Sequence, residues 1–131
     1  MIVVDASAMT ELLLQTTLGS RVEARLFRDG DALHAPHLLD VEVLQALRRI
    51  VFKKDTLPAR AEEAIQDLLL FDIVRHPHDH LLGRAWELRD GLSSYDAMYI
   101  ALAEAVDATL VTCDGPLGRA PWHSARVEVI R

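Results

Sequence analysis

A chain of 131 residues has the length of one ordinary domain, and because half of its residues are hydrophobic it excludes the disordered and fibrous classes. Its formal net charge of −6 excludes a general polyanion binder, because affinity for a nucleic-acid backbone depends on basic surface. We therefore expect a single domain over residues 1–131, in which any nucleic acid is bound by a local basic patch or through a bound metal.

Neither a secretion signal nor a membrane span is expected. The chain reaches Asp5 before any long apolar run and has no basic segment ahead of it, unlike a signal peptide. The apolar run 97–106 is too short for a span and is interrupted by Glu104. The single cysteine, Cys113, cannot form an internal disulfide, and with no histidine close in sequence we expect a small core residue rather than a nucleophile. These features predict a soluble protein of the cytoplasm.

The first half of the chain alternates between strand and helix patterns. It predicts, in chain order, a strand over residues 2–4, a helix over 8–14, a helix over 20–28, a strand over 32–35 and a helix over 38–54. Ser20 is the candidate cap of the second segment, and Pro36 is expected to end the strand before it. The last segment is long and amphipathic, so we expect one of its faces to be buried.

The second half repeats the alternation. It predicts a helix over 58–69, a strand over 71–74, helices over 80–89 and from Ser93 or Ser94 through 106, and strands over 109–112 and 127–130. Pro58 suits a first helical turn, where its missing N–H is not needed. The segment 97–105 is apolar nearly all round, which predicts a buried helix.

This order of elements predicts the fold class. Strands that alternate with helices indicate an α/β domain with one central, mostly parallel sheet of about five strands and helices on both faces. Ligands of such sheets bind beyond the carboxyl ends of the strands. We therefore look for functional side chains immediately after the predicted strands.

Asp5 and Asp114 stand at two such strand ends. Asp5 directly follows the strand over 2–4, and Asp114 follows the strand over 109–112 by two residues, so both are expected at one edge of the sheet. Each also has a purely structural interpretation: Asp5 as a helix N-cap, and Asp114 as a turn former before Gly115.

Two further acids lie on predicted helices. Glu42 is at the rim of an apolar helical stripe and faces the sheet as much as solvent, although an exposed glutamate paired with an arginine would have the same spacing. Asp96 begins the buried helix, where a carboxylate needs a partner. With Ser93 it also fits the pattern of a capping box.

The combination of these acids favours a metal site. Two carboxylates about 4 Å apart repel by about 4 kcal/mol at an effective dielectric constant of 20, so four of them together require cations or raised pKa values. All-oxygen ligation favours Mg²⁺ or Mn²⁺. Ser7 and Thr112 are close in sequence to the acids, and their hydroxyls are candidates to hold ligands or water by hydrogen bonds.

At these residues the sequence resembles the PIN-domain nucleases, in particular the short VapC-type toxin ribonucleases of prokaryotic toxin–antitoxin pairs. The motifs that carry the resemblance are Val3-Val4-Asp5-Ala6-Ser7, Ala35-Pro36-His37-Leu38-Leu39-Asp40-Val41-Glu42-Val43, Ser94-Tyr95-Asp96-Ala97 and Leu110-Val111-Thr112-Cys113-Asp114. Their order and spacing span nearly the whole chain. The resemblance implies a three-layer α/β/α fold.

It also implies that the metal-binding and catalytic acids are Asp5, Glu42, Asp96 and Asp114. The implied activity is Mg²⁺- or Mn²⁺-dependent endonucleolytic cleavage of RNA, with an antitoxin protein that covers the site and a homodimeric state. Metal lowers the pKa of bound water, and a carboxylate not used fully in ligation can take the proton of that water. The loop after Asp114 holds no further acid, so we expect one well-held ion and a second, if any, recruited by substrate phosphate.

Other polar and aromatic side chains are interpreted more simply. His76, His78 and His80 alternate as zinc ligands can, but the intervening proline and the lack of downstream ligands favour an exposed loop. Arg48 and Arg49 near the end of the Glu42 helix either contact RNA phosphates or complement the helix C-terminus. Trp86 and Trp122 have no second aromatic nearby in sequence, so we expect packing or interface residues rather than base-stacking platforms.

Two other functions compete with the toxin ribonuclease. A catalytically idle PIN-like module that binds proteins would use the acids only as caps and surface charges. A metal-dependent phosphoesterase acting on DNA or on small phosphate esters would use the same acids in the same way. The presence of all four acids favours an enzyme.

Overall fold

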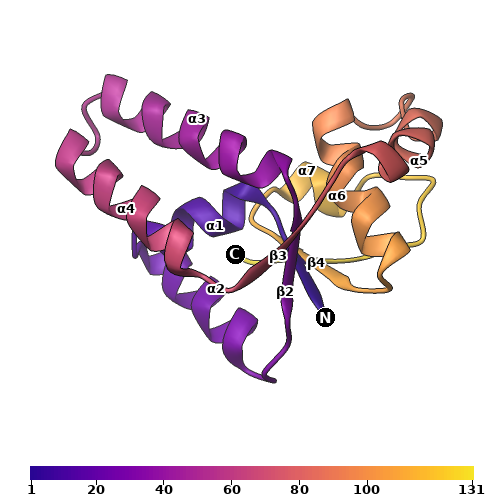
Figure 1. The fold of residues 1–131 in the computed structure, drawn as a ribbon, viewed down its shortest axis with the longest axis horizontal. Coiled ribbons are helices and arrows are strands. Elements are labelled where there is room, and N and C mark those ends of the chain that lie inside the picture. Colours follow the sequence, from indigo (N-terminus) through magenta and orange to yellow (C-terminus); the bar gives the residue numbers. More distant parts are fainter.

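The computed structural model describes all 131 residues and shows strands alternating with helices, as the sequence predicts (Figure 1). The elements are β1 (Ile2–Val4), α1 (Ala6–Leu13), α2 (Thr17–Phe27), β2 (Leu33–Pro36), α3 (Leu38–Phe52), α4 (Pro58–Leu70), β3 (Ile73–His76), the 3₁₀ turn η1 (Asp79–Leu81), α5 (Leu82–Glu87), α6 (Ser94–Ala105), β4 (Thr109–Thr112), α7 (Gly115–Gly118) and β5 (Arg126–Val129).

The five strands form one sheet in the order β3-β2-β1-β4-β5. Every neighbouring pair is parallel, so the sheet is wholly rather than mostly parallel. The central strand, β1, pairs Ile2 with Leu33 of β2 on one side and with Thr109 of β4 on the other. The chain moves outward to β2 and β3 and then returns to β4 beside β1, so the strand order reverses between β1 and β4. This is the position at which open parallel sheets form a ligand crevice.

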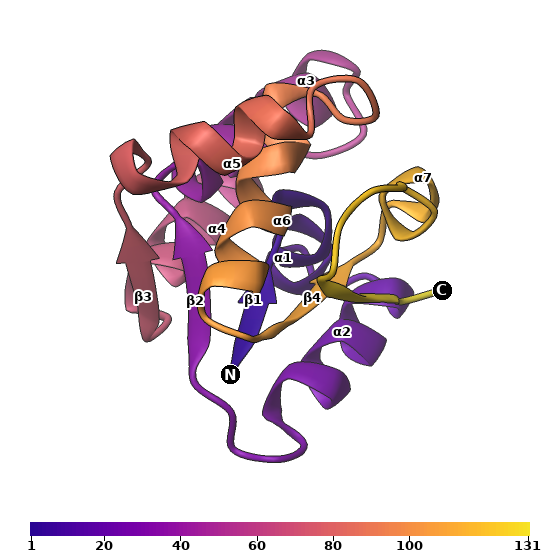
Figure 2. The same cartoon turned by 90° about the vertical axis from the view of Figure 1, so that its right-hand side faces the viewer.

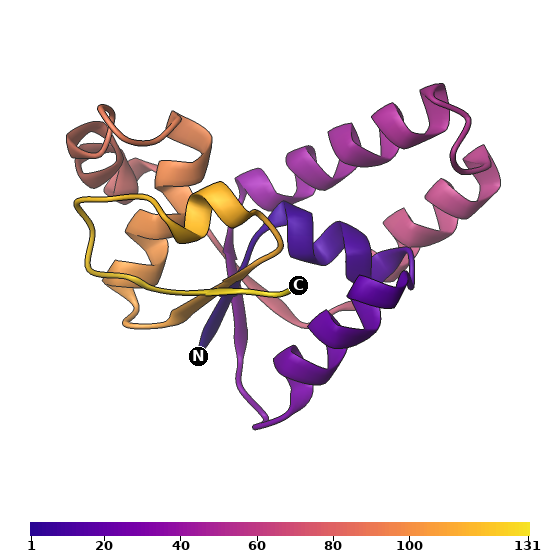
Figure 3. The same cartoon turned by 180° about the vertical axis from the view of Figure 1, so that it is seen from behind.

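Helices cover both faces of the sheet, which gives the three expected layers. Figure 1 shows α1 to α4 on one side of the strands and α5 and α6 on the other, and Figure 3 shows the same division from behind. In Figure 2, α6 lies across the sheet, consistent with its contacts with β1, β2 and β4. The helices α3 and α4 form a hairpin that projects beyond the sheet (Figure 1).

Capping side chains fix where the helices begin. The Thr16 hydroxyl accepts a hydrogen bond from the Gly19 N–H at 2.9 Å, so α2 starts at Thr17 and the prediction of Ser20 as its cap was wrong. The Ser93 hydroxyl accepts from the Asp96 N–H at 3.2 Å, which starts α6 as predicted. Pro58 lies in the first turn of α4, also as predicted.

The third strand and α7 differ from the sequence prediction. The strand predicted over 71–74 occupies Ile73–His76, because Phe71 ends α4 and stacks on Phe27 of α2 with ring centroids 6.1 Å apart. The turn expected after Asp114 is a short helix, Gly115–Gly118, whose glycines disfavour helix on propensity alone. The other boundaries differ from the prediction by a few residues at most.

One hydrophobic core fills both sides of the sheet. Its 32 buried residues include all three residues of β1 and a continuous run of α6 from Ala97 to Ala103 in which only the tyrosine is polar. The prediction of a buried helix at this place is confirmed. None of the helices combines the length and the apolar character needed to cross a bilayer.

Candidate metal centre

The four predicted acids line one cavity of about 550 Å³ at the carboxyl edge of the sheet. Asp5 directly follows β1 and Asp114 follows β4, while Glu42 comes from α3 and Asp96 from the first turn of α6. Elements that are distant in sequence therefore bring the four carboxylates to the point where the strand order reverses.

Asp5 is the most buried of the acids, with 5% of its surface exposed. Its Oδ1 accepts hydrogen bonds from the Ala8 N–H at 3.0 Å and from the Ser7 hydroxyl at 2.7 Å. Its Oδ2 accepts a short hydrogen bond from the Thr112 hydroxyl. The aspartate caps α1, as its structural interpretation proposed, and it also lines the cavity. Capping and ligation are therefore compatible for this residue.

Ser7 and Thr112 tie the two central strand ends together. The Ser7 hydroxyl accepts from the Cys113 N–H, and the Thr112 hydroxyl accepts from the Asp114 N–H, both at 2.9 Å. The two hydroxyl oxygens are 3.2 Å apart. This network orients Asp5 and the backbone of Asp114 at once, while the Asp114 side chain makes no capping bond to α7.

Glu42 has a partner that the sequence did not reveal. Its Oε1 accepts a hydrogen bond from the Tyr99 hydroxyl at 2.6 Å. Tyr99 is 1% exposed, and burial followed by the hydrogen bond to Glu42 raises the pKa of its hydroxyl far above the ordinary range. The tyrosine is therefore a permanent donor that holds one oxygen of Glu42. The signal was its position three residues after Asp96, which places both on one side of α6.

The charges of the site are uncompensated. Burial raises the pKa of the Asp5, Glu42 and Asp96 carboxyls. The neighbouring charge of Asp114 raises the pKa of Asp96 further, and the charge of Asp96 acts in the same way on the other two. None of the four acids belongs to an ion pair. Such a cavity favours a bound cation.

The donor set fits a hard divalent cation, because it consists of carboxylate and hydroxyl oxygens. No three acidic, histidine or cysteine side chains are close enough together to hold one ion directly. Mg²⁺ is commonly bound through only one or two carboxylates and keeps several waters, so the spacing suits an ion that bridges to the remaining acids through water.

Two further charged residues line the cavity. Glu11 of α1 is an additional acid that the sequence interpretation missed, and its carboxylate accepts a short hydrogen bond from the Thr16 hydroxyl. Arg49 is the one basic residue in the lining. Arg48, by contrast, places its guanidinium 4.4 Å from the centroid of the Phe52 ring, in the neighbouring groove between α3 and α4. The predicted pair of arginines is therefore divided between two surfaces.

Cys113 and the alternating histidines lie in different environments. Burial raises the pKa of the Cys113 thiol to about 11, so the thiol is protonated at neutral pH and is a poor nucleophile. His78 Nε2 accepts from the Leu38 N–H at 2.9 Å, and the ring nitrogens of His76 and His34 are 2.8 Å apart. His76 is thus the last residue of β3, and it and His78 are half-buried, so the prediction of an exposed loop is wrong for these two and holds for His80.

Comparison with known proteins identifies the family. The family model of the PIN domain matches residues 2–122. Ribonuclease VapC12 of Mycobacterium tuberculosis is 37% identical over 130 residues, and the match covers 99% of each chain. Ribonuclease VapC3 of the same species is 43% identical over 125 residues, which cover 95% of this chain and 89% of the relative.

Among solved structures, PAE2754 from Pyrobaculum aerophilum is similar with a TM-score of 0.70 and 26% identity, over 98% of this chain and 83% of that one. VapBC2 from Rickettsia felis has the same fold, with a TM-score of 0.69 at 14% identity over 98% of each chain. The chain therefore belongs to the PIN-domain family, and within it to the VapC ribonucleases.

Proposed function

We propose that this protein is a Mg²⁺- or Mn²⁺-dependent endoribonuclease and the toxin of a toxin–antitoxin pair. The observation that carries the proposal is one cavity, at the reversal point of a PIN-family sheet, lined by four half-buried or buried carboxylates that have no ion-pair partner. Relatives that match nearly the whole chain carry the name ribonuclease, which supports RNA as the substrate.

In this proposal Asp5, Glu42, Asp96 and Asp114 hold the ion, one or two of them directly and the others through its bound waters. A bound divalent cation supplies a lowered pKa for the attacking water and offsets negative charge on the phosphoryl oxygens. Neighbouring side chains hold two of these carboxylates in position. Ser7 and Thr112 hold the Asp5 carboxylate in place, and Tyr99 fixes one oxygen of Glu42.

A carboxylate that is not fully used in ligation takes the proton of the attacking water. The raised pKa values of Glu42 and Asp96 suit that step, because a base whose pKa is nearer to neutral transfers protons more effectively in both directions. Arg49 stands in the same cavity without an ion-pair partner, and we assign to it a contact with an RNA phosphate.

We further propose that the antitoxin binds the groove between α3 and α4. This groove has a volume of about 420 Å³, and its lining includes Leu44, Val51, Phe52 and Ile65. Gln45 lines both the groove and the acidic cavity, so a protein chain in the groove lies beside the metal site and can cover it. An apolar surface of this kind is typical of a protein-binding site.

We also propose that the chain forms a homodimer, as the family resemblance implies, and that it acts in the cytoplasm. The exposed apolar side chains of the α3–α4 hairpin, such as Leu57 and Leu70, supply surface for self-association. Light scattering of the purified chain tests the dimer directly, since a monomer at micromolar concentration would contradict it.

The decisive experiment is cleavage of a structured RNA by the purified protein with Mg²⁺, with Mn²⁺ and with a chelator. Asp96→Asn and Asp5→Asn are expected to abolish metal-dependent cleavage, whereas Asp72→Asn, which changes an exposed acid outside the cavity, is expected to retain it. Equal cleavage by all four proteins would refute the site. Cleavage of DNA or of small phosphate esters in preference to RNA would favour the phosphoesterase, and no cleavage of any substrate would favour the idle module.

A further inference from the structure

Glu11 is the one acid of the cavity to which the proposed metal centre gives no role. It lies on α1 and lines the cavity together with the four predicted acids, and it belongs to no ion pair. Burial, followed by the charges of Asp5 and Glu11, raises the pKa of the Cys113 thiol, so both carboxylates act on the same side chain of the cavity wall. Glu11 is therefore a neighbour of the metal centre without an assigned function.

The Glu11 carboxylate is held by the hydroxyl that caps α2. The Thr16 hydroxyl donates a short hydrogen bond to Glu11 Oε2 and accepts one from the Gly19 N–H at 2.9 Å. A hydroxyl has a single hydrogen to give, so the hydrogen of Thr16 is committed to Glu11. Thr16 lies outside the lining of the cavity, and Glu11 Oε1 has no hydrogen-bond partner in the chain. One oxygen of the carboxylate is thus fixed, and the other is free to accept.

Close packing of α1 on α2 also fixes the position of Glu11. A Cβ added to Gly19 would be 2.0 Å from the Glu11 carbonyl oxygen, so no larger residue could stand at this place without moving the two helices apart. The glycine lets Thr16 and the last turns of α1 approach each other closely. The place of the carboxylate in the cavity wall is therefore set by the backbone as well as by the hydrogen bond.

The proposed reaction does not by itself distinguish RNA from DNA. The nucleophile is a metal-activated water rather than the 2′-hydroxyl of the ribose, so the same step would cleave a deoxyribose strand. The 2′-hydroxyl is the group by which a protein tells RNA from DNA. Trp86 and Trp122 are 67% and 69% exposed, as interface residues can be, and neither lines the cavity. Selectivity for RNA therefore needs a hydrogen-bonding side chain inside the cavity.

Few polar groups of the cavity are available for that contact. Arg49 has donors only and is assigned to a phosphate, and the Thr10 hydroxyl is closed off from solvent. Gln45 is exposed, has no hydrogen bond to hold it and also lines the apolar groove. Among the groups not assigned to the ion, Glu11 alone combines a fixed position with a free, charged acceptor, which forms stronger hydrogen bonds than a neutral one. A carboxylate is also the group that binds a ribose hydroxyl in dinucleotide-binding folds.

We infer that Glu11 determines the specificity for RNA: its free oxygen accepts a hydrogen bond from the 2′-hydroxyl of a ribose that adjoins the scissile phosphate. The inference rests on the proposed ribonuclease function. Arg49, which lines the same cavity, contacts a phosphate of the same strand. The strand is thus bound in the cavity by its sugar and its phosphates, and this selectivity requires no contact with a base.

Substrates modified at one sugar test the inference on the unaltered protein. The bond that the protein cleaves in a structured RNA with Mg²⁺ is mapped first, and the two riboses that flank it are then replaced one at a time. A 2′-fluoro group keeps the sugar pucker of RNA but has no hydrogen to donate. At one of the two positions, 2′-fluoro and 2′-deoxy sugars are each expected to lower kcat/KM about ten- to hundredfold, as the loss of a hydrogen bond to a charged acceptor does. Equal cleavage of all the strands would overturn the inference and leave the nuclease intact.

Glu11→Gln removes the free acceptor and keeps the shape of the side chain. Because the hydrogen of Thr16 needs an acceptor, the amide oxygen is expected to face Thr16 and the NH₂ group the cavity. The variant should raise the KM for the unmodified RNA at least about tenfold, leave kcat nearly unchanged and cleave the hydroxyl and fluoro strands equally. If it keeps the parent's preference for the hydroxyl strand, Glu11 has only a structural role and the inference is wrong.

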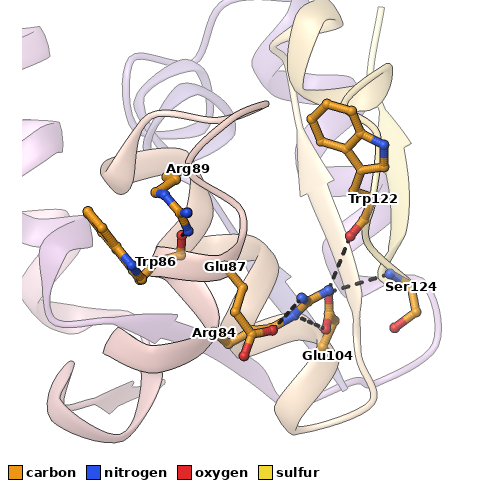
Figure 4. A network of polar contacts seen from close by, with 7 residues as sticks. All are labelled: Arg84, Trp86, Glu87, Arg89, Glu104, Trp122 and Ser124. Atoms are coloured by element: carbon orange, nitrogen blue, oxygen red, sulfur yellow. Dashed lines mark hydrogen bonds and ion pairs between the residues drawn. The ribbon is translucent and has the colours of Figure 1, made fainter.

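Glu87→Gln is the matched control. Glu87 of α5 also accepts a hydrogen bond, from Arg84 at 3.0 Å, within the polar network that joins Arg84 to Glu104 and to the Trp122 carbonyl (Figure 4). It lies outside the cavity, so the control should keep both the KM and the preference of the parent. A preference lost in both variants would show that the effect does not come from the cavity, and would contradict the inference.

Binding separates this inference from the proposed function. If the protein binds RNA in Mg²⁺ without cleaving it, the nuclease fails and fluorescence anisotropy decides the inference. A preference for an all-ribose over an all-2′-fluoro strand that Glu11→Gln abolishes supports it, and equal affinities overturn it. If Glu11→Gln lowers the affinity for Mg²⁺ and keeps the preference for the hydroxyl, Glu11 holds a cation and the inference is wrong. If the protein binds no RNA, both proposals fail.

Discussion

Helix α3 contributes to two surfaces of opposite character. On one side, Glu42 and Arg49 line a cavity of about 550 Å³ that is rich in carboxylates. On the other, Leu44 and Phe52 line an apolar groove of about 420 Å³. The cavity offers carboxylates that can hold a metal ion. The groove offers apolar side chains that can bind a protein partner, and it has no cluster of acids. Because the proposed catalytic cavity and the proposed antitoxin groove lie on different sides of α3, we expect substitutions to affect RNA cleavage and antitoxin binding separately.

The largest effect is expected in the cavity, from Asp5→Asn. An asparagine still caps α1, because its side-chain oxygen accepts the Ala8 N–H, but it removes a negative ligand. Metal-dependent RNA cleavage should fall by at least about a hundredfold. Circular dichroism should show an unchanged fold, and affinity for the antitoxin should persist. If the variant cleaves RNA normally, the cavity is not the catalytic centre.

The next effect is expected in the groove, from Leu44→Glu. The side chain is 52% exposed, so the fold tolerates the change, but a charge in an apolar interface should cost about 2 kcal/mol of binding free energy, or about thirtyfold in affinity. The measurement is calorimetry with the proposed antitoxin, which would be sought among small proteins encoded beside this gene.

Gln66→Glu, which places the same charge on α4 outside the groove, is the matched control and should bind normally. RNA cleavage by Leu44→Glu should equal that of the parent. A shared loss of binding and cleavage would contradict the division of α3 into two surfaces.

A smaller effect is expected from Tyr99→Phe, which tests whether the hydrogen bond to Glu42 contributes to catalysis. Without the phenol, one oxygen of Glu42 loses its donor, and kcat should fall about tenfold. Because the tyrosine's hydrogen bond lowers the pKa of Glu42, its removal should shift the acidic limb of the pH–rate profile to higher pH. Tyr95→Phe removes an exposed hydroxyl from the same helix and should change neither quantity.

The smallest effect is expected on the pH dependence of the Tm of the metal-free protein, again from Asp5→Asn. Burial raises the pKa of Asp5 in the folded state, so the native chain binds this proton more tightly than the unfolded chain does. The contribution of Asp5 to stability is therefore greatest at low pH and declines as pH rises from the ordinary aspartate pKa through the raised one. The Tm of Asp5→Asn minus that of the parent should accordingly be larger at pH 7.5 than at pH 5.

Groups that the substitution leaves unchanged contribute equally to both proteins and cancel in that difference. Saturating Mn²⁺ should raise the Tm of the parent more than that of Asp5→Asn, because binding to the native state alone stabilises it. A difference in Tm that is constant with pH would show that the carboxyl is not perturbed.

The sequence predicted the fold well, because its signals are local. Strand runs end at turn residues and helices begin at caps, so the α/β class, the five strands and the parallel sheet follow from the pattern. The exceptions arise from contacts across the chain. Phe71 stacks on Phe27, so β3 begins two residues later than predicted. Gly118 lies against Val129 of β5, where a Cβ added to the glycine would be 2.3 Å from a methyl group of the valine. The packing of α7 on β5 overrides the low helix propensity of its glycines.

The candidate site was predictable only in part. The acids at strand ends could be found because parallel strands place their carboxyl ends together. The Tyr99 donor to Glu42 and the position of Glu11 in the cavity depend on how α6 and α1 are rotated against their neighbours, which one sequence does not specify. The sequence left Trp122 as either a packing or an interface residue, and it could not decide between them because Gly91 and Arg84, which the tryptophan contacts, are distant in sequence.

The pairing of β1 with β4 also has a consequence for the order of events during synthesis. Asp5 is bonded to Thr112, 107 residues later in the chain, and Val4 pairs with Val111. A ribosome-bound chain that has not yet released β4 therefore lacks Asp114 and the Thr112 hydroxyl that bonds Asp5, although the other three acids have already been made. On the proposed assignment of the acids, we expect the nascent chain to be inactive until nearly its last residues emerge, which would give the antitoxin the period of translation in which to be present first.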